Sequence, residues 1–166
     1  LEAEEAVEPL LQKQKFLLAR KRYTTREMRK KLEQFSKKRG VNCEVIVEVL
    51  DRLIELRYLN DEQFAEDFIS SRIRLRPKGI YLIKKELERK GVPKDVIDNA
   101  MSEVEVDEIE MANRLLRKKM KSWEKFDSRK RKEKGYAFLS SRGFKPDTIY
   151  KVVGRCYDLS ADEDLT

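Results

Sequence analysis

The segment Gly91-Val92-Pro93-Lys94-Asp95-Val96-Ile97 has two near copies in the chain, and this repetition decides the fold. The copies are Gly40-Val41-Asn42-Cys43-Glu44-Val45-Ile46, 51 residues before it, and Gly143-Phe144-Lys145-Pro146-Asp147-Thr148-Ile149, 52 residues after it. A nearly constant period of this length is typical of stacked supersecondary units, each of which buries its apolar face against its neighbours.

Each position of the repeated segment has a local physical reason. The glycine suits the left-handed residue that ends a helix, and the apolar residue after it suits a contact beside that cap. Asparagine or proline and then an acid suit the start of a new helix. The apolar residues that follow recur at i, i+3, i+4 and i+7, which predicts a helix with one buried face. They are Ile46, Val49, Leu50 and Leu53; Ile97, Ala100, Met101 and Val104; and Ile149, Val152, Val153 and Cys156.

Two further helices are predicted in each unit. Residues 28–32 resemble residues 83–87, and both stretches precede a repeat glycine. Apolar residues at helical spacing also open each unit, within 10–18, 64–69 and 109–120. The sequence therefore predicts an all-α protein of about nine helices in three tandem three-helix repeats. We expect repeat 1 over 1–58, repeat 2 over 59–103, a basic repeat 3 over 104–158, and an acidic tail over 159–166.

The composition argues against an enzyme. The 166 residues include no histidine, two distant cysteines (Cys43 and Cys156), and no glycine-rich phosphate-binding loop. His-based acid–base catalysis and spaced His/Cys zinc sites are therefore excluded, and we expect no catalytic residue, metal or other cofactor. No apolar run approaches the roughly 18 residues that span a membrane. No secretory signal is visible, so we expect a cytoplasmic protein, or an organellar one if a leader was removed before Leu1.

The charge distribution points to an anionic partner. The net charge is +7, and eight acids within residues 1–10 and 158–166 leave +15 on residues 11–157. Residues 114–134 hold eleven bases against three acids. Candidate binding residues are the bases of this stretch and a smaller cluster near residue 20, namely Arg114, Lys118, Lys119, Lys121, Arg129, Lys130, Arg131, Lys132, Arg20 and Arg22. The alternatives are a solvated Lys/Glu-rich surface, or a single helix that runs from acidic residues 103–111 to these bases and complements its own dipole.

Aromatic residues accompany the basic stretch. Trp123, Phe126, Tyr136 and Phe138 could stack on unpaired bases, although core packing is the favoured interpretation.

Several segments resemble RecX proteins, the regulators of the RecA recombinase. The central match runs from Leu59-Asn60-Asp61-Glu62-Gln63-Phe64-Ala65 through Arg72 to Gly91 and Val92. Residues 22–32 resemble the first repeat of that family, and residues 138–149 resemble its third, which contains Arg142-Gly143-Phe144. Asn60 departs from the family, which often has a second acid there. Asp61 suits a helix start, Ala65 suits the core, and Arg72 is either a further binding candidate or part of an internal ion pair.

The resemblance implies an elongated, curved array of three helical repeats. It also implies a non-catalytic, monomeric modulator, mainly an inhibitor, that lodges in the groove of the RecA–single-stranded-DNA filament and regulates recombination and DNA repair. The expected partners are RecA and the single-stranded DNA within the filament, and some members of the family also bind DNA directly. The alternative is a stand-alone nucleic-acid-binding protein built from helix-turn-helix-like units, although nothing specifies a recognition helix.

Overall fold

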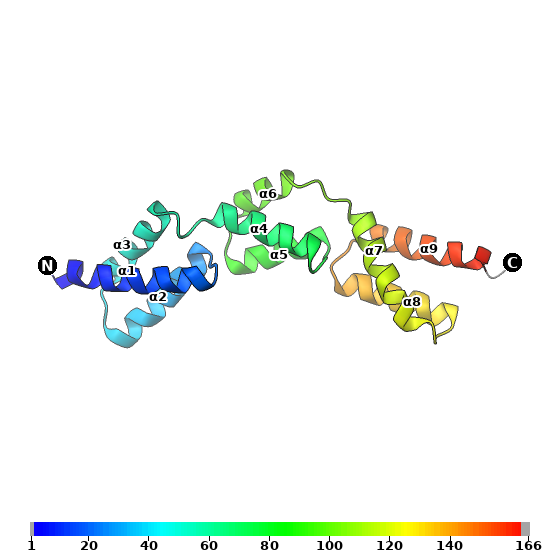
Figure 1. Cartoon of the computed structure of the whole chain (residues 1–166), viewed down its shortest axis with the longest axis horizontal. Helices are drawn as coiled ribbons and strands as arrows, with labels where there is room; N and C mark the ends of the chain where they lie inside the picture. The colour runs from blue at the N-terminus through cyan, green and yellow to red at the C-terminus, as the bar shows by residue number, and fades with distance from the viewer. Residues whose placement is uncertain (1, 164–166) are drawn as a thin grey trace. The chain divides into compact units, whose positions relative to one another are not determined.

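The fold consists of helices joined by short connections. A computed structural model describes residues 2–163, with side chains described from 7 to 157, and in that range it has nine α-helices, one short 3-10 helix and no strand (Figure 1). The elements are α1 (Glu2–Arg20), α2 (Thr25–Arg39), α3 (Cys43–Glu55), α4 (Asp61–Arg74), α5 (Ile80–Lys90), α6 (Lys94–Ser102), α7 (Glu108–Met120), η1 (Lys121–Trp123), α8 (Ser128–Ser141) and α9 (Pro146–Glu163). The all-α prediction is confirmed. The three repeat boundaries stay a prediction, and the acidic tail lies outside the described side chains.

The repeat glycines have the predicted left-handed conformation. Gly40, Gly91 and Gly143 have φ values of 69°, 86° and 77°, and each follows the middle helix of a triplet. The apolar residues after the second and third of them, Val92 and Phe144, are buried. A left-handed residue ends the helix and turns the chain, so the next helix packs back against its predecessor.

By its internal contacts the chain divides into two compact units. Unit 1 comprises residues 1–68 and 87–102, and unit 2 comprises residues 69–86 and 103–166, so α4 and α5 each contribute one part to either unit. The core of unit 1 lies between α1, α2 and α3 (Figure 1). Its buried residues include all four apolar positions predicted for the first copy of the repeat, Ile46, Val49, Leu50 and Leu53.

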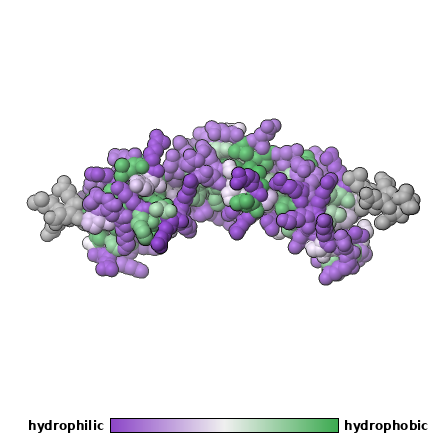
Figure 2. All heavy atoms as spheres, in the orientation of Figure 1, coloured by the Kyte–Doolittle hydropathy of each residue, from purple (hydrophilic) through white to green (hydrophobic). Residues whose placement is uncertain are grey.

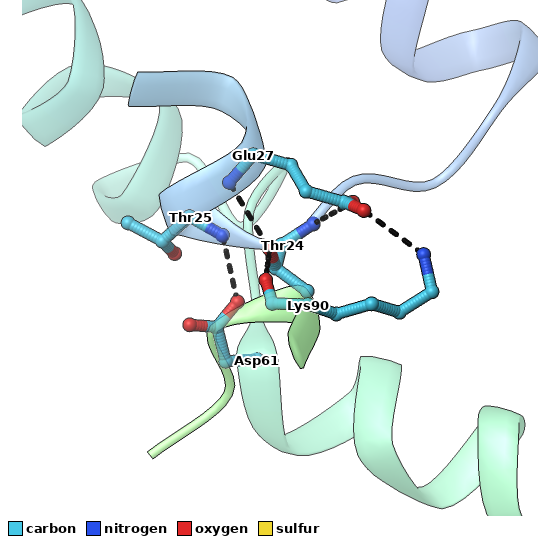
Figure 3. A network of polar contacts seen from close by, with 5 residues as sticks. All are labelled: Thr24, Thr25, Glu27, Asp61 and Lys90. Atoms are coloured by element: carbon cyan, nitrogen blue, oxygen red, sulfur yellow. Dashed lines mark hydrogen bonds and ion pairs between the residues drawn. The ribbon is translucent and has the colours of Figure 1, made fainter. Parts of the chain in front are cut away.

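A polar network fixes the start of α2 within unit 1 (Figure 3). The buried hydroxyl of Thr24 accepts a hydrogen bond from the Glu27 N–H (3.1 Å) and donates one to the Lys90 carbonyl oxygen (2.6 Å). The Glu27 carboxylate accepts from the Thr24 N–H (3.2 Å) and pairs with the Lys90 ammonium group (2.9 Å). The Asp61 carboxylate accepts from the Thr25 N–H (2.8 Å). A capping box is thus present, and the same network joins α2 to α4 and α5.

Unit 2 has a second core between α7, α8 and α9. Leu116, Leu139, Val152 and Val153 are fully buried there, and Trp123 is buried at the edge. Cys156 is half-buried on the same face, as predicted. Burial raises the pKa of the Cys156 thiol, which is consistent with a packing role rather than a reactive one.

Two loops of unit 2 meet with almost no space between their backbones. The Gly79 N–H donates a hydrogen bond to the Arg142 carbonyl oxygen at 2.8 Å. A Cβ atom on Gly79 would lie 2.0 Å from the Gly143 carbonyl oxygen, and one on Gly143 would lie 2.4 Å from Leu82 Cβ. Both glycines are therefore required for the α4–α5 loop to pack against the α8–α9 turn.

We predict that Gly79→Ala destabilises the protein by about 2 kcal/mol, because the added methyl group forces two backbone segments apart. Urea unfolding followed by circular dichroism measures this. Gly154→Ala is the matched control, since no atom lies within 4 Å of a Cβ there and the residue is inside α9. It should raise stability by about 0.5–1 kcal/mol. Equal urea midpoints for Gly79→Ala and the wild type would contradict the close approach.

Candidate polyanion-binding surface

The net positive charge of the chain belongs entirely to unit 2. Unit 1 contains 17 bases and 17 acids, whereas unit 2 contains 21 bases and 14 acids. Hydrophilic residues cover most of the face seen in Figure 2, as expected of a chain in which 42% of residues are charged. The distribution of charge between the units, rather than the total charge, indicates that a polyanion would be attracted to unit 2.

The basic stretch spans two helices rather than one. α7 ends at Met120, η1 follows, and α8 begins at Ser128. The interpretation as a single helix that complements its dipole is therefore wrong for the second half of the stretch. It holds for α7, whose first turn carries Glu108 and Glu110 and whose last turn carries Arg117, Lys118 and Lys119.

In α8 the basic residues lie at the N-terminal end, where the helix dipole disfavours positive charge. Arg129, Lys130, Arg131 and Lys132 occupy the first turn and a half, where the helix dipole is positive. The Asp127 carboxylate caps the helix by accepting from the Lys130 N–H at 2.9 Å, and this hydrogen bond lowers the pKa of Asp127. Each cation in such a place costs about 0.3–1 kcal/mol. Helix stability therefore does not explain the cluster.

The exposed candidates lie on α7, η1 and the start of α8. Arg114, Lys118, Lys119, Lys121, Arg129 and Lys130 are exposed. Arg114, Lys118 and Lys121 are spaced four and three residues apart, which places them on one face of α7 and η1.

Arg131 and Lys132, the two remaining candidates on α8, are half-buried rather than exposed, and part of each side chain packs within the fold. Lys132 Nζ lies 5.9 Å from the centroid of the Tyr157 ring in α9, and the Arg131 Nε atom is buried without a hydrogen-bond partner. Arg129 makes an exposed contact of 3.3 Å with Glu133, which is worth little in stability.

The remaining candidates are engaged within the fold. Arg72 Nε lies 2.8 Å from the Glu86 carboxylate, which also pairs with Lys78. Burial alone would raise the pKa of Glu86, but hydrogen bonds from Lys78 and Arg72 bring that pKa below its ordinary value. The alternative of an internal ion pair for Arg72 is thus confirmed. In unit 1, Arg22 pairs with Asp67, and the Arg20 guanidinium lies over the Phe16 ring, 4.5 Å from its centroid.

The aromatic residues of the basic stretch are mainly core residues, as favoured from the sequence. Trp123 is buried, while Phe126, Tyr136 and Phe138 pack against the unit 2 core. Two binding candidates were not predicted from the sequence: Arg76 and Arg142 line a hollow together with Lys118 and Lys119. Both arginines precede the glycines that bring the two loops together, and that proximity is not visible in a linear sequence.

Two other kinds of site receive no support within the described residues. No group of three or more cysteine and carboxylate side chains is placed there to hold a metal ion. No described helix combines the length and apolar character needed to cross a membrane.

We predict that Arg129→Gln/Lys130→Gln weakens binding to a single-stranded oligonucleotide without loss of folding stability. Two lost phosphate contacts should reduce the slope of log K against log salt by about 1.4. The midpoint of thermal unfolding should stay constant or rise, because two cations leave the positive end of α8. Fluorescence anisotropy at several salt concentrations and thermal circular dichroism measure the two effects.

Lys37→Gln/Lys38→Gln is the matched control for this pair. These lysines lie in the last turn of α2 in unit 1, where the dipole favours cations. Their loss should slightly lower stability and leave oligonucleotide affinity nearly constant. Unaltered affinity of the α8 variant at both low and moderate salt would show that its bases are only a solvated surface.

Comparison with known proteins identifies the family. Family models match at two places, the second three-helix domain of RecX over residues 60–101 and the third three-helix domain over residues 105–153. Regulatory protein RecX of Haemophilus influenzae (strain PittEE) is 33% identical over 140 residues, which cover 84% of this chain and 89% of that protein. Regulatory protein RecX of Prosthecochloris aestuarii is 36% identical over 131 residues, which cover 79% and 82% of the two chains.

A solved structure supports the same fold. The crystal structure of RecX from Lactobacillus salivarius superposes with a TM-score of 0.77, covering 94% of this chain and 99% of that chain at 22% identity. At this identity the structural similarity shows the fold alone, whereas the sequence matches show descent. The chain therefore belongs to the RecX family of regulatory proteins.

Proposed function

We propose that this protein is a non-catalytic modulator of a RecA recombinase. It binds in the groove of the RecA–single-stranded-DNA filament, mainly as an inhibitor, in the bacterial cytoplasm, and so regulates recombination and DNA repair. The observation that carries the proposal is the combination of RecX membership with a net charge of +7 that belongs to unit 2 alone.

A nucleoprotein filament is a partner whose chemistry suits this charge distribution. It offers DNA phosphates together with protein carboxylates, and lysine and arginine side chains bind both kinds of anion. Unit 1 has no net charge to direct it to an anion, so it supplies protein contacts. Unit 2 supplies the electrostatic attraction, chiefly through Lys118, Lys121 and the start of α8.

Inhibition would follow from occupancy of the groove. RecA subunits change their packing during ATP turnover, and a folded protein bound across neighbouring subunits opposes that change. The energy comes from a difference in affinity between two filament states, because a ligand shifts an equilibrium only by such a difference. No chemical step on the chain is required.

The test is a titration of the protein into RecA, single-stranded DNA and ATP. We predict that ATP hydrolysis and strand exchange fall as the protein saturates the filament. Arg129→Gln/Lys130→Gln should require several-fold more protein for half-inhibition than Lys37→Gln/Lys38→Gln does, since charge-assisted contacts to phosphate or carboxylate are lost. Unchanged hydrolysis and exchange at saturating protein would contradict the proposal.

A second arm separates this function from that of a stand-alone nucleic-acid-binding protein, which the basic unit 2 also suits. A protein that merely sequesters DNA inhibits RecA by removing its cofactor, so excess single-stranded DNA restores hydrolysis. A protein that binds the filament inhibits preformed filaments, and DNA added afterwards has little effect. Full recovery on added DNA would favour the stand-alone reading.

A further inference from the structure

A hollow of about 590 Å³ opens on unit 2 within the basic surface. The α4–α5 loop, α7, η1 and the C-terminal part of α8 contribute its walls. Its volume lies within the range of small-ligand sites, and no carboxylate lines it. One part of the lining of the hollow is apolar and another part is cationic.

The apolar surface is formed by Leu75, Leu115 and Phe138. The Phe138 ring is held edge-on by the buried Trp123, with centroids 5.9 Å apart and planes at 81°. Leu75 is 70% exposed beside the hollow, which leaves apolar area available to a ligand. A flat apolar group could therefore be bound against fixed side chains.

The cationic surface is formed by Arg76, Lys118, Lys119 and Arg142. Within residues 7–157 none of these four is in an ion pair. The Arg142 guanidinium carbon lies 5.4 Å from the Phe138 ring centroid, so a planar cation and an aromatic ring are neighbours in one wall. Aromatic rings and arginine planes are the side chains on which unpaired bases stack.

We propose that this hollow binds one unpaired base of a single-stranded nucleic acid. The base stacks against Phe138 and Arg142, beside Leu75, and Arg76, Lys118 and Lys119 hold the flanking phosphates. Arg114 and Lys121, on the same face of α7 and η1 as Lys118, continue the phosphate track. The inference deepens the proposed function by giving the chain its own contact with the strand, and its test needs no RecA.

Two considerations favour a single strand over other anionic partners. In a duplex the faces of the bases are already stacked, so only an unpaired base offers a face to Phe138. An acidic protein segment would need a contact area of about 800 Å² per partner for a stable complex, whereas this hollow is suited to one planar group with its charges.

The experiment compares two fluorescent oligomers of equal length, an oligothymidylate and an abasic strand with the same phosphates. We predict that the wild type binds the oligothymidylate about 5- to 150-fold more tightly, as expected of one stacked base. Phe138→Leu should abolish this preference, and Leu75→Ser should reduce it. Lys118→Gln/Lys119→Gln should weaken binding to both strands by the same factor, because phosphates are common to both.

Controls separate stacking from folding. Tyr150→Leu removes an aromatic ring that is 65% exposed elsewhere in unit 2, and it should leave the preference intact. Leu75→Ser changes an exposed side chain, so it remains informative even if Phe138→Leu does not fold. Equal affinity of the wild type for the two oligomers, or a full preference in Leu75→Ser and Phe138→Leu, would overturn the proposal.

A third arm tests the other class of partner. If a peptide of alternating glutamate and leucine binds more tightly than the oligothymidylate and loses affinity in Leu75→Ser, the hollow is a protein-docking site and the proposal is wrong. If the protein inhibits RecA but binds the oligothymidylate and the abasic strand equally, the base-binding hollow is wrong while the proposed function is still supported.

Discussion

The left-handed glycine after the middle helix of each triplet is the constraint on which the rest of the structure depends. A residue with a Cβ atom adopts φ values of 69–86° only at a cost, so glycine is required where the chain must turn at once into the next helix. At Gly143 the requirement is doubled, because Leu82 approaches the position that a Cβ would occupy. This turn aligns the third helix with the core and brings the α8–α9 turn against the α4–α5 loop, beside which Arg76 and Arg142 line the hollow.

Charge is distributed unequally between the two units. Unit 1 balances its charges and is fastened by the polar network at the start of α2, whereas unit 2 carries the whole excess of positive charge. Within unit 2, the start of α8 concentrates cations where the helix dipole opposes them. A surface that lowers its own stability in this way is consistent with selection for binding, because natural proteins tolerate local costs at functional sites.

Local features were predictable from the sequence, and long-range proximity was not. The asparagine cap before α3 and the glycine turns each depend on residues a few positions apart, so their patterns predicted the helices correctly. The break between α7 and α8 contradicts only the alternative of one continuous basic helix, which the basic stretch allowed because it passes the break without a proline or glycine. The contacts of Thr24 with Lys90 in unit 1 and of Gly79 with Arg142 in unit 2 join residues more than sixty positions apart, and no local signal in the sequence indicates them.

We infer that unit 2 provides the electrostatic contact with the nucleoprotein filament. Hydrogen exchange of the protein, measured free and bound to RecA on single-stranded DNA, tests it most directly. We predict that binding slows exchange in α7, η1 and the first turns of α8, and that salt reduces this protection more steeply than any protection in α1–α3. Protection confined to α1–α3, with α7 and α8 exchanging as in the free protein, would contradict it.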